Sequence, residues 1–151
     1  MRNSNTRSHA NTRQNSSKRY VYRDRIIERL ERGNITFSGL EPEILIKAAE
    51  ELGKEIRNED LKNHQLRRLF GAIKGIEYET KRQKAEDTLK KDIVAQLVFL
   101  KIHLANAQQK LKNIKELKRI MDVILSSKFF LTKKDLDYFV RFFEAILAYH
   151  E

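Results

Sequence analysis

Residues 132–151 read TKKDLDYFVRFFEAILAYHE, and this stretch says most about the fold. Thr132 and Asp135 have the T-x-x-D spacing of a capping box, which predicts that a helix begins here. Apolar residues then recur every three or four positions, as on one wide helical face: Leu136, Phe139, Val140, Phe143, Ile146 and Leu147. We interpret this segment as a core helix of an all-α bundle, with aromatic residues that serve packing.

Apolar residues keep the same helical spacing through most of the chain. They predict helices near residues 20–32, 42–56 and 59–79, and further apolar repeats at 89–111 and 117–125. Gly33 and Asn34 should end the first helix, Pro42 should open the second and Asn58 should cap the third. Strand signals are almost absent, and residues 34–42 are the only candidate for a short extended segment. The heptad register slips between segments, so we expect a compact helical bundle of about five to six helices.

Beyond Gly75 the chain contains no glycine and no proline. The turns that a bundle requires there are expected near residues 81–87 and 108–115, and they must depend on tertiary packing. If these segments straightened, helices could be exchanged between chains, giving a homodimer in isolation.

Length and composition predict one helical-bundle domain, residues 20–151, within a chain of 151 residues of which 40% are hydrophobic. The sequence has no cysteine, which excludes disulfides and thiolate metal sites. No apolar run approaches the roughly 20 residues of a membrane span, and the N-terminus lacks the apolar stretch of a signal peptide. We therefore expect a soluble, cytoplasmic protein with no membrane partner.

Positive charge is concentrated at the N-terminus of a chain whose formal net charge is +10. Residues 1–25 hold seven basic side chains and one acid, Asp24. Residues 1–19 are rich in Asn, Ser, Thr and Arg without apolar periodicity, which predicts a disordered basic arm. Such an arm contacts nucleic acid in some proteins and is only a solvated leader in others, and we weigh the two about equally.

No arrangement of side chains in the sequence indicates catalysis. The four histidines are scattered and show no metal-binding spacing: His9, His64, His103 and His150. Gly71 and Gly75 fall inside a predicted helix, so they do not form a phosphate-binding loop. Acidic residues do not cluster as in a two-metal site. We expect a protein that is not an enzyme and uses no cofactor and no metal.

Basic residues in helical register suggest nucleic-acid binding instead. Arg67, Lys74 and Lys81 are spaced seven apart along one predicted helix. Lys62 and Arg68 extend this positive surface, Gln65 could add a neutral donor, and Lys90, Lys91 and Lys101 form a second cluster. Neutralising phosphates with such residues releases counterions and adds affinity. The alternative for each cluster is a helix face whose charges only keep the protein soluble.

Three segments together resemble the small subunit of type III-A CRISPR effector complexes. They are LKNHQLRRLF at 61–70, LVFLKIHLANA at 97–107 and FVRFFEAILAYHE at 139–151. The resemblance implies a non-catalytic subunit, present in several copies, that stacks into an inner filament. Its partners would be guide RNA, target RNA, the backbone and large subunits of the complex, and other copies of itself.

The resemblance also implies which residues contact RNA. Lys62, Gln65, Arg67 and Arg68 come first, on the matching helix that continues to Lys74. Lys101 and Arg141 come next, although Arg141 could equally pair with Glu144 and serve only the fold.

Phe142 falls off the main apolar face of the last helix, and such surplus aromatic residues, together with Tyr138 and Tyr149, would suit packing against neighbouring subunits.

Two other classes of protein remain open. One is a free-standing basic helical nucleic-acid-binding protein, associated with the ribosome or the nucleoid. The other is a helical adaptor that binds no nucleic acid.

Overall fold

The structure is a computed structural model, and it describes residues 21–56 and 64–150. These residues form six α-helices and no strand, which confirms the all-α prediction. The helices are α2 (Val21–Arg32), α3 (Pro42–Glu55), α4 (His64–Glu79), α5 (Lys91–Lys110), α6 (Lys115–Ile124) and α7 (Lys133–His150), with short 3-10 helices at η1 (Phe37–Gly39), η2 (Lys112–Ile114) and η3 (Ser127–Phe129). The predicted arm at 1–19, the Asn58 cap and Lys62 lie outside the described residues.

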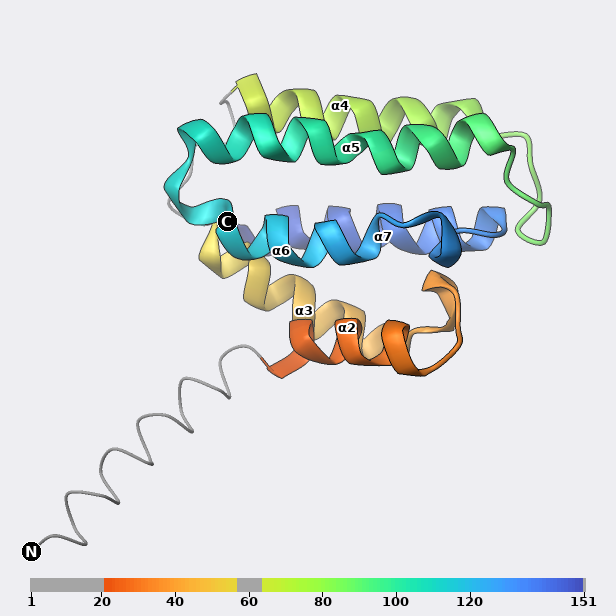
Figure 1. Cartoon of the computed structure of the whole chain (residues 1–151), viewed down its shortest axis with the longest axis horizontal. Helices are drawn as coiled ribbons and strands as arrows, with labels where there is room; N and C mark the ends of the chain where they lie inside the picture. The colour runs from red at the N-terminus through yellow and green to blue at the C-terminus, as the bar shows by residue number, and fades with distance from the viewer. Residues whose placement is uncertain (1–20, 57–63, 151) are drawn as a thin grey trace, which may run out of the picture.

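The six helices are arranged in layers around α7 (Figure 1). The α4 and α5 pair forms one layer, α6 and α7 form the next, and α3 with α2 lies on the far side. α7 packs against α3, α4 and η1, so two of its flanks are covered. Its predicted core residues Leu136, Phe139 and Ile146 are fully buried, which confirms that this segment is a core helix.

Phe142 is buried, and the prediction that it is free to pack against neighbouring subunits is wrong. Its side chain is 2% exposed, and its ring lies 6.0 Å from that of Phe37, between ring centroids. Phe37 belongs to η1, in the segment 34–42 that the sequence marks as the candidate for extended structure. Because η1 folds over a second flank of α7, the apolar face of α7 is wider than its helical spacing alone indicates.

Asp135 fastens η1 to the start of α7. Its Oδ2 accepts hydrogen bonds from the backbone N–H groups of Leu131 at 2.9 Å and Thr132 at 3.0 Å, and its Oδ1 accepts one from Ser38 at 2.8 Å. The helix begins at Lys133, as the capping box predicts. Burial raises the pKa of Asp135, but the hydrogen bonds from Ser38, Thr132 and Leu131 outweigh it, so that the pKa lies below its ordinary value.

The connection between α4 and α5 turns without glycine or proline because the start of α7 holds it. Leu89 donates its N–H to the carbonyl of Leu131, and Lys133 donates its own to the carbonyl of Asp87, both at 2.9 Å. Lys134 makes the same kind of hydrogen bond with Ala85. The turn expected near residues 81–87 is therefore present, and tertiary hydrogen bonds fix it.

Gly53 marks the closest approach of α3 and α7. A Cβ atom at this position would lie 2.7 Å from both the carbonyl oxygen of Ile146 and the Cβ of Tyr149. Real side chains do not approach so closely, so any larger residue must push the two helices apart.

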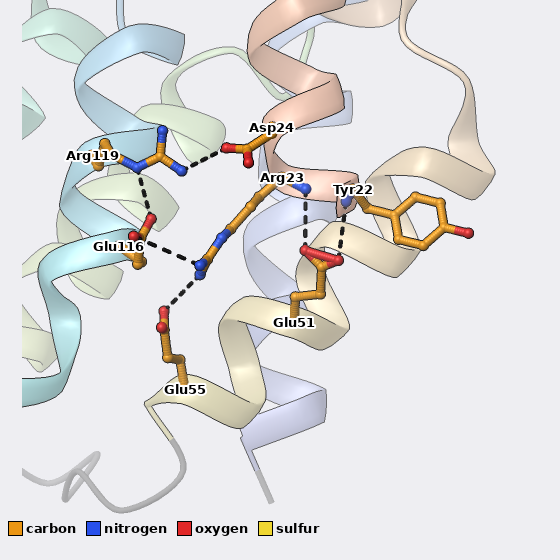
Figure 2. A network of polar contacts seen from close by, with 7 residues as sticks. All are labelled: Tyr22, Arg23, Asp24, Glu51, Glu55, Glu116 and Arg119. Carbon is orange, nitrogen blue, oxygen red and sulfur yellow. Dashed lines mark hydrogen bonds and ion pairs between the residues drawn. The ribbon is translucent and has the colours of Figure 1, made fainter. Parts of the chain in front are cut away.

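A buried arginine, Arg23, joins α2 to α3 and α6 (Figure 2). Its side chain is 2% exposed, and its guanidinium lies 2.9 Å from the carboxylate of Glu55 and 3.7 Å from that of Glu116. Glu51 accepts hydrogen bonds from the backbone N–H groups of Tyr22 and Arg23, which lie in the first turn of α2. One of the seven basic residues counted in residues 1–25 is therefore an internal residue of the bundle.

Burial raises the pKa of both Glu51 and Glu55, and this outweighs the opposite effect of Arg23 and its neighbours. The backbone N–H groups of Tyr22 and Arg23 limit the rise for Glu51, and the Arg23 guanidinium limits it for Glu55. In the part of the chain that the structure describes, no helix has the length and apolar composition of a membrane span.

Candidate nucleic-acid interface

The exposed part of α4 carries Arg67 and Arg68, two of the basic residues predicted to bind RNA. Leu69, Ile73 and Ile76 form the buried side of this helix, whereas Arg67 and Arg68 are exposed. Neither arginine forms an ion pair with a described residue. The backbone of Gln65 lies in the first turn of the same helix, and its side chain lies outside what the structure describes, as does the whole of Lys62.

Lys74 continues this row, but acidic neighbours balance its charge. Its ammonium forms ion pairs with Glu77, at 3.3 Å, and with Glu144 of α7. The hydrogen bond to Glu144 raises the pKa of Lys74, and that to Glu77 adds to the rise. The pair with Glu144 links α4 to α7 across the surface. Lys74 therefore contributes less free positive charge than Arg67 or Arg68.

Arg141 is exposed on α7, one helical turn before Glu144. The sequence left open whether Arg141 contacts RNA or pairs with Glu144. In the structure, Glu144 pairs with Lys74 instead. Arg141 makes no ion pair within the described residues. It borders a hollow of about 200 Å³, whose other lining residues are Pro42, Leu45, Ile46, Tyr138, Phe142 and Ala145.

The Lys74–Glu144 pair brings Arg67 and Arg141 onto one surface. α4 and α7 run in opposite directions (Figure 1). Arg67 lies two turns before Lys74 and Arg141 one turn before Glu144, so the two arginines flank the pair on opposite sides. At 1.5 Å per residue, they are separated by roughly 15 Å along the helix axes. That span corresponds to a few phosphates of one nucleic-acid strand.

Lys101 lies apart from this surface. Leu100 and His103 line the groove between α5 and α4. The helical register turns Lys101 to the opposite flank of α5, away from α4. The structure therefore brings Arg67 and Arg141 together beside Lys74. Arg68 shares the flank of Ala72 and Gly75, which line the groove with α5, and Lys101 lies on another side.

The sequence interpretation missed Tyr78, a residue beside this basic row. Tyr78 is 66% exposed, and the ammonium of Lys81 lies 4.0 Å from the centre of its ring. Lys74, Lys81 and Lys133 line one shallow hollow with it. Lys81 itself lies in the turn after α4, not on the helix with Arg67 and Lys74 as the sequence predicts. An aromatic residue three positions before a lysine was the available signal, since a cation can stack on such a ring. Exposed aromatic rings among basic residues are surfaces on which bases can stack.

The described residues contain no group of three His, Asp or Glu side chains placed to hold a metal ion. His103 lies on α5 and His150 on the last turn of α7, on different elements of the fold.

Comparison with known proteins gives one match. A family model described as Csm2 Type III-A matches residues 39–151, which includes all of α3 to α7. The match also covers the three segments that resemble the small subunit of type III-A complexes. No curated protein and no solved structure matches the chain.

Proposed function

Because the chain belongs to the Csm2 family of type III-A CRISPR systems, we propose that it forms part of the inner filament and contacts target RNA there. The family is that of the structural small subunit of the complex. What supports RNA binding is the exposed surface of α4 and α7, where Arg67, Arg68 and Arg141 lack carboxylate partners among the described residues.

These arginines would bind phosphates. A guanidinium presents several N–H donors in a plane and remains charged at any physiological pH, which suits a phosphate group. Phosphate contacts carry no sequence information, so base pairing with the guide RNA would provide the specificity. Lys62, Gln65 and Lys101 remain further predicted RNA-binding residues, and Lys74 would act mainly by joining α4 to α7.

The proposal includes a non-catalytic role in the cytoplasm. The partners would be guide RNA, target RNA, the backbone and large subunits, and further copies of this chain. We expect the isolated protein to leave RNA and DNA intact in the presence of Mg²⁺ or Mn²⁺. Metal-dependent cleavage that survives rigorous purification and is lost on changing one acidic residue would contradict this.

The test is target-RNA binding by the assembled complex, with Arg67 and Arg68 changed to alanine. Affinity should fall, and its dependence on salt should flatten by about 0.7 in the log–log slope for each phosphate that is no longer bound. Arg141→Ala alone should give a smaller change in the same direction. Arg32→Ala is the matched control, since Arg32 is 82% exposed on α2 and lies on another element.

The variant and wild-type complexes must be compared at the same extent of assembly. Circular dichroism and melting temperature should stay nearly unchanged, because exposed substitutions shift stability by less than about 0.5 kcal/mol. If the double variant assembles normally and binds target RNA with an unchanged affinity and slope, the site assignment is wrong. If the native protein carries heterogeneous nucleic acid but no guide RNA, a free-standing nucleic-acid-binding protein becomes the better description.

A further inference from the structure

Tyr78 is an aromatic residue that lies open to solvent near the end of α4. Its side chain is 66% exposed, whereas Thr80, two residues later, is fully buried. The carbonyl of Glu77 accepts hydrogen bonds from the hydroxyl of Thr80 at 3.0 Å and from its N–H group at 3.1 Å. The backbone that carries Tyr78 is therefore fixed, and its ring stands on a rigid part of the bundle.

The fold does not need the ring of Tyr78 to hold the connection that follows α4. The ammonium of Lys81 lies 4.0 Å from the centre of the ring, and such a contact at an exposed site contributes little to stability. Backbone hydrogen bonds already join this connection to the start of α7, and their donors are Leu89, Lys133 and Lys134. A role in folding therefore does not account for an aromatic residue at this position.

The ring borders a shallow hollow whose charges balance except at Lys81. The hollow has a volume of about 510 Å³, and the residues that line it with Tyr78 are Lys74, Glu77, Lys81 and Lys133. Lys74 pairs with two glutamates, and Lys133 pairs with Asp137 at 2.9 Å. Of these three lysines, only Lys81 makes no ion pair with another described residue. The hollow thus offers a neutral space beside an aromatic ring, with one free ammonium at its edge.

Positive charge continues from Lys81 into the connection between α4 and α5. Arg82 and Lys84 are exposed, and residues 81–91 hold five basic and two acidic side chains. Lys134 donates its N–H to the carbonyl of Ala85 at 2.9 Å, which places the first turn of α7 against this connection. Figure 1 shows both at the same end of the bundle. This end therefore presents an exposed ring beside groups that attract an anion.

We propose that Tyr78 and Lys81 bind one unpaired nucleotide of an RNA strand. The base stacks on the ring of Tyr78, and a phosphate lies against the ammonium of Lys81. Proteins bind single strands through such a combination of aromatic rings and basic groups. A base inside a duplex is already stacked and paired, so it cannot lie on this ring. The site rests on the RNA binding proposed above and adds a preference for an unpaired strand over a duplex.

The position of Tyr78 on α4 favours an RNA strand over an acidic segment of another protein. Arg67 and Tyr78 are eleven positions apart, which is roughly three helical turns, so their side chains leave the helix on the same side. The distance between them along the axis is roughly 16 Å. A strand whose phosphates contact Arg67 and Arg141 therefore reaches the ring within a few nucleotides, without leaving the surface of α4 and α7.

Binding of a short single-stranded oligouridine to the full chain, followed by fluorescence anisotropy, measures the contribution of the ring. Tyr78→Ala should weaken binding roughly tenfold, as the loss of one stacked base does. Tyr78→Phe keeps the ring and should bind like the wild type. Phe99→Ala is the matched control, since Phe99 is an aromatic residue of α5 with a similar exposed fraction of 63%, and it should have no effect.

The dependence on salt separates stacking from phosphate contact. Stacking releases no counterions, so Tyr78→Ala should lower the affinity without changing the log–log slope against salt. Lys81→Ala should flatten this slope by about 0.7, as expected for one phosphate on a single strand. Duplex RNA of the same length offers no free base, so Tyr78→Ala and the wild type should bind it equally.

A 2-aminopurine placed within the oligouridine reports stacking directly, because its fluorescence is quenched when its ring stacks. At saturating protein, the wild type and Tyr78→Phe should quench it, and Tyr78→Ala should not. Equal quenching and equal affinity for the wild type and Tyr78→Ala would overturn the site. If this occurs while the Arg67→Ala and Arg68→Ala variant still binds RNA weakly, the proposed function stands and only the Tyr78 site fails.

Assembly with the other subunits of the complex tests the alternative occupant. The Tyr78→Ala chain should assemble like the wild type, since the ring binds RNA in this proposal. A variant that binds oligouridine normally but assembles poorly would show that Tyr78 contacts a protein, and the nucleotide site would be wrong.

Discussion

Replacing Arg23 by methionine is the most informative test of the fold. The change keeps most of the volume of the side chain and removes its charge. Glu55 and Glu116, at 26% and 28% exposed, are then left at the junction of α2, α3 and α6 without the Arg23 guanidinium. Breaking a buried ion pair costs about 3–5 kcal/mol, and these carboxylates remain partly accessible to water. We expect a loss of roughly 3 kcal/mol, or a melting temperature lower by roughly 6–12 °C.

The loss should depend on pH in a defined direction. Burial raises the pKa of Glu55, and removing Arg23 removes an effect that opposes this rise. A carboxyl group whose pKa is raised by folding stabilises the fold below its unfolded pKa, and this contribution is lost as pH rises through the folded pKa. The Arg23→Met variant should therefore recover stability as the pH falls from 7 towards the raised pKa of Glu55, where this carboxyl group takes up a proton.

Urea unfolding at pH 7 and pH 5, followed by circular dichroism, measures both effects. The variant Arg23→Met, Glu55→Gln should recover part of the loss at pH 7, because a neutral amide replaces the unpaired carboxylate. Arg119→Ala is the control in the same network, since Arg119 is 44% exposed and its pairs should contribute no more than about 1 kcal/mol. A loss below about 1 kcal/mol for Arg23→Met, or one that is equal at both pH values, would refute the reasoning.

Gly53→Ala should destabilise the protein by about 1–2 kcal/mol in urea unfolding, since the new Cβ meets Ile146 and Tyr149. Gly71→Ala lies at a site with open space and should stabilise the protein by up to about 1 kcal/mol. Equal effects at both glycines would contradict the close approach of α3 and α7. Asp135→Asn should cost about 1–3 kcal/mol at pH 7. In the wild type, this contribution should be lost as the pH falls through the lowered pKa of Asp135. If the difference in the free energy of unfolding between the two chains stays constant below pH 4, this role of Asp135 is contradicted. Phe142→Ala should cost about 3–5 kcal/mol, and a loss under about 1 kcal/mol would mean that the side chain is not buried.

The sequence determined the fold class and most helix positions, because these depend on interactions within a few residues. Pro42 opens α3, Asn34 takes a positive φ of 50° just after α2, and α7 begins one residue after Thr132. Each of these signals acts through the local backbone, by fixing φ or by satisfying the free N–H groups at a helix end. The family could also be recognised from local motifs, since the matching segments are continuous in the sequence.

The tertiary structure alone decided which side chains are available on the surface. Lys74 has the same helical register as Arg67, yet it pairs with Glu144, 70 residues away. Arg23 is one of the seven basic residues that concentrate positive charge in residues 1–25, yet it is buried against Glu55, 32 residues away. Phe142 lies off the apolar face of its own helix and is covered by η1. Periodicity reports only the order of residues around one helix, whereas burial and ion pairing depend on which distant segment packs against it.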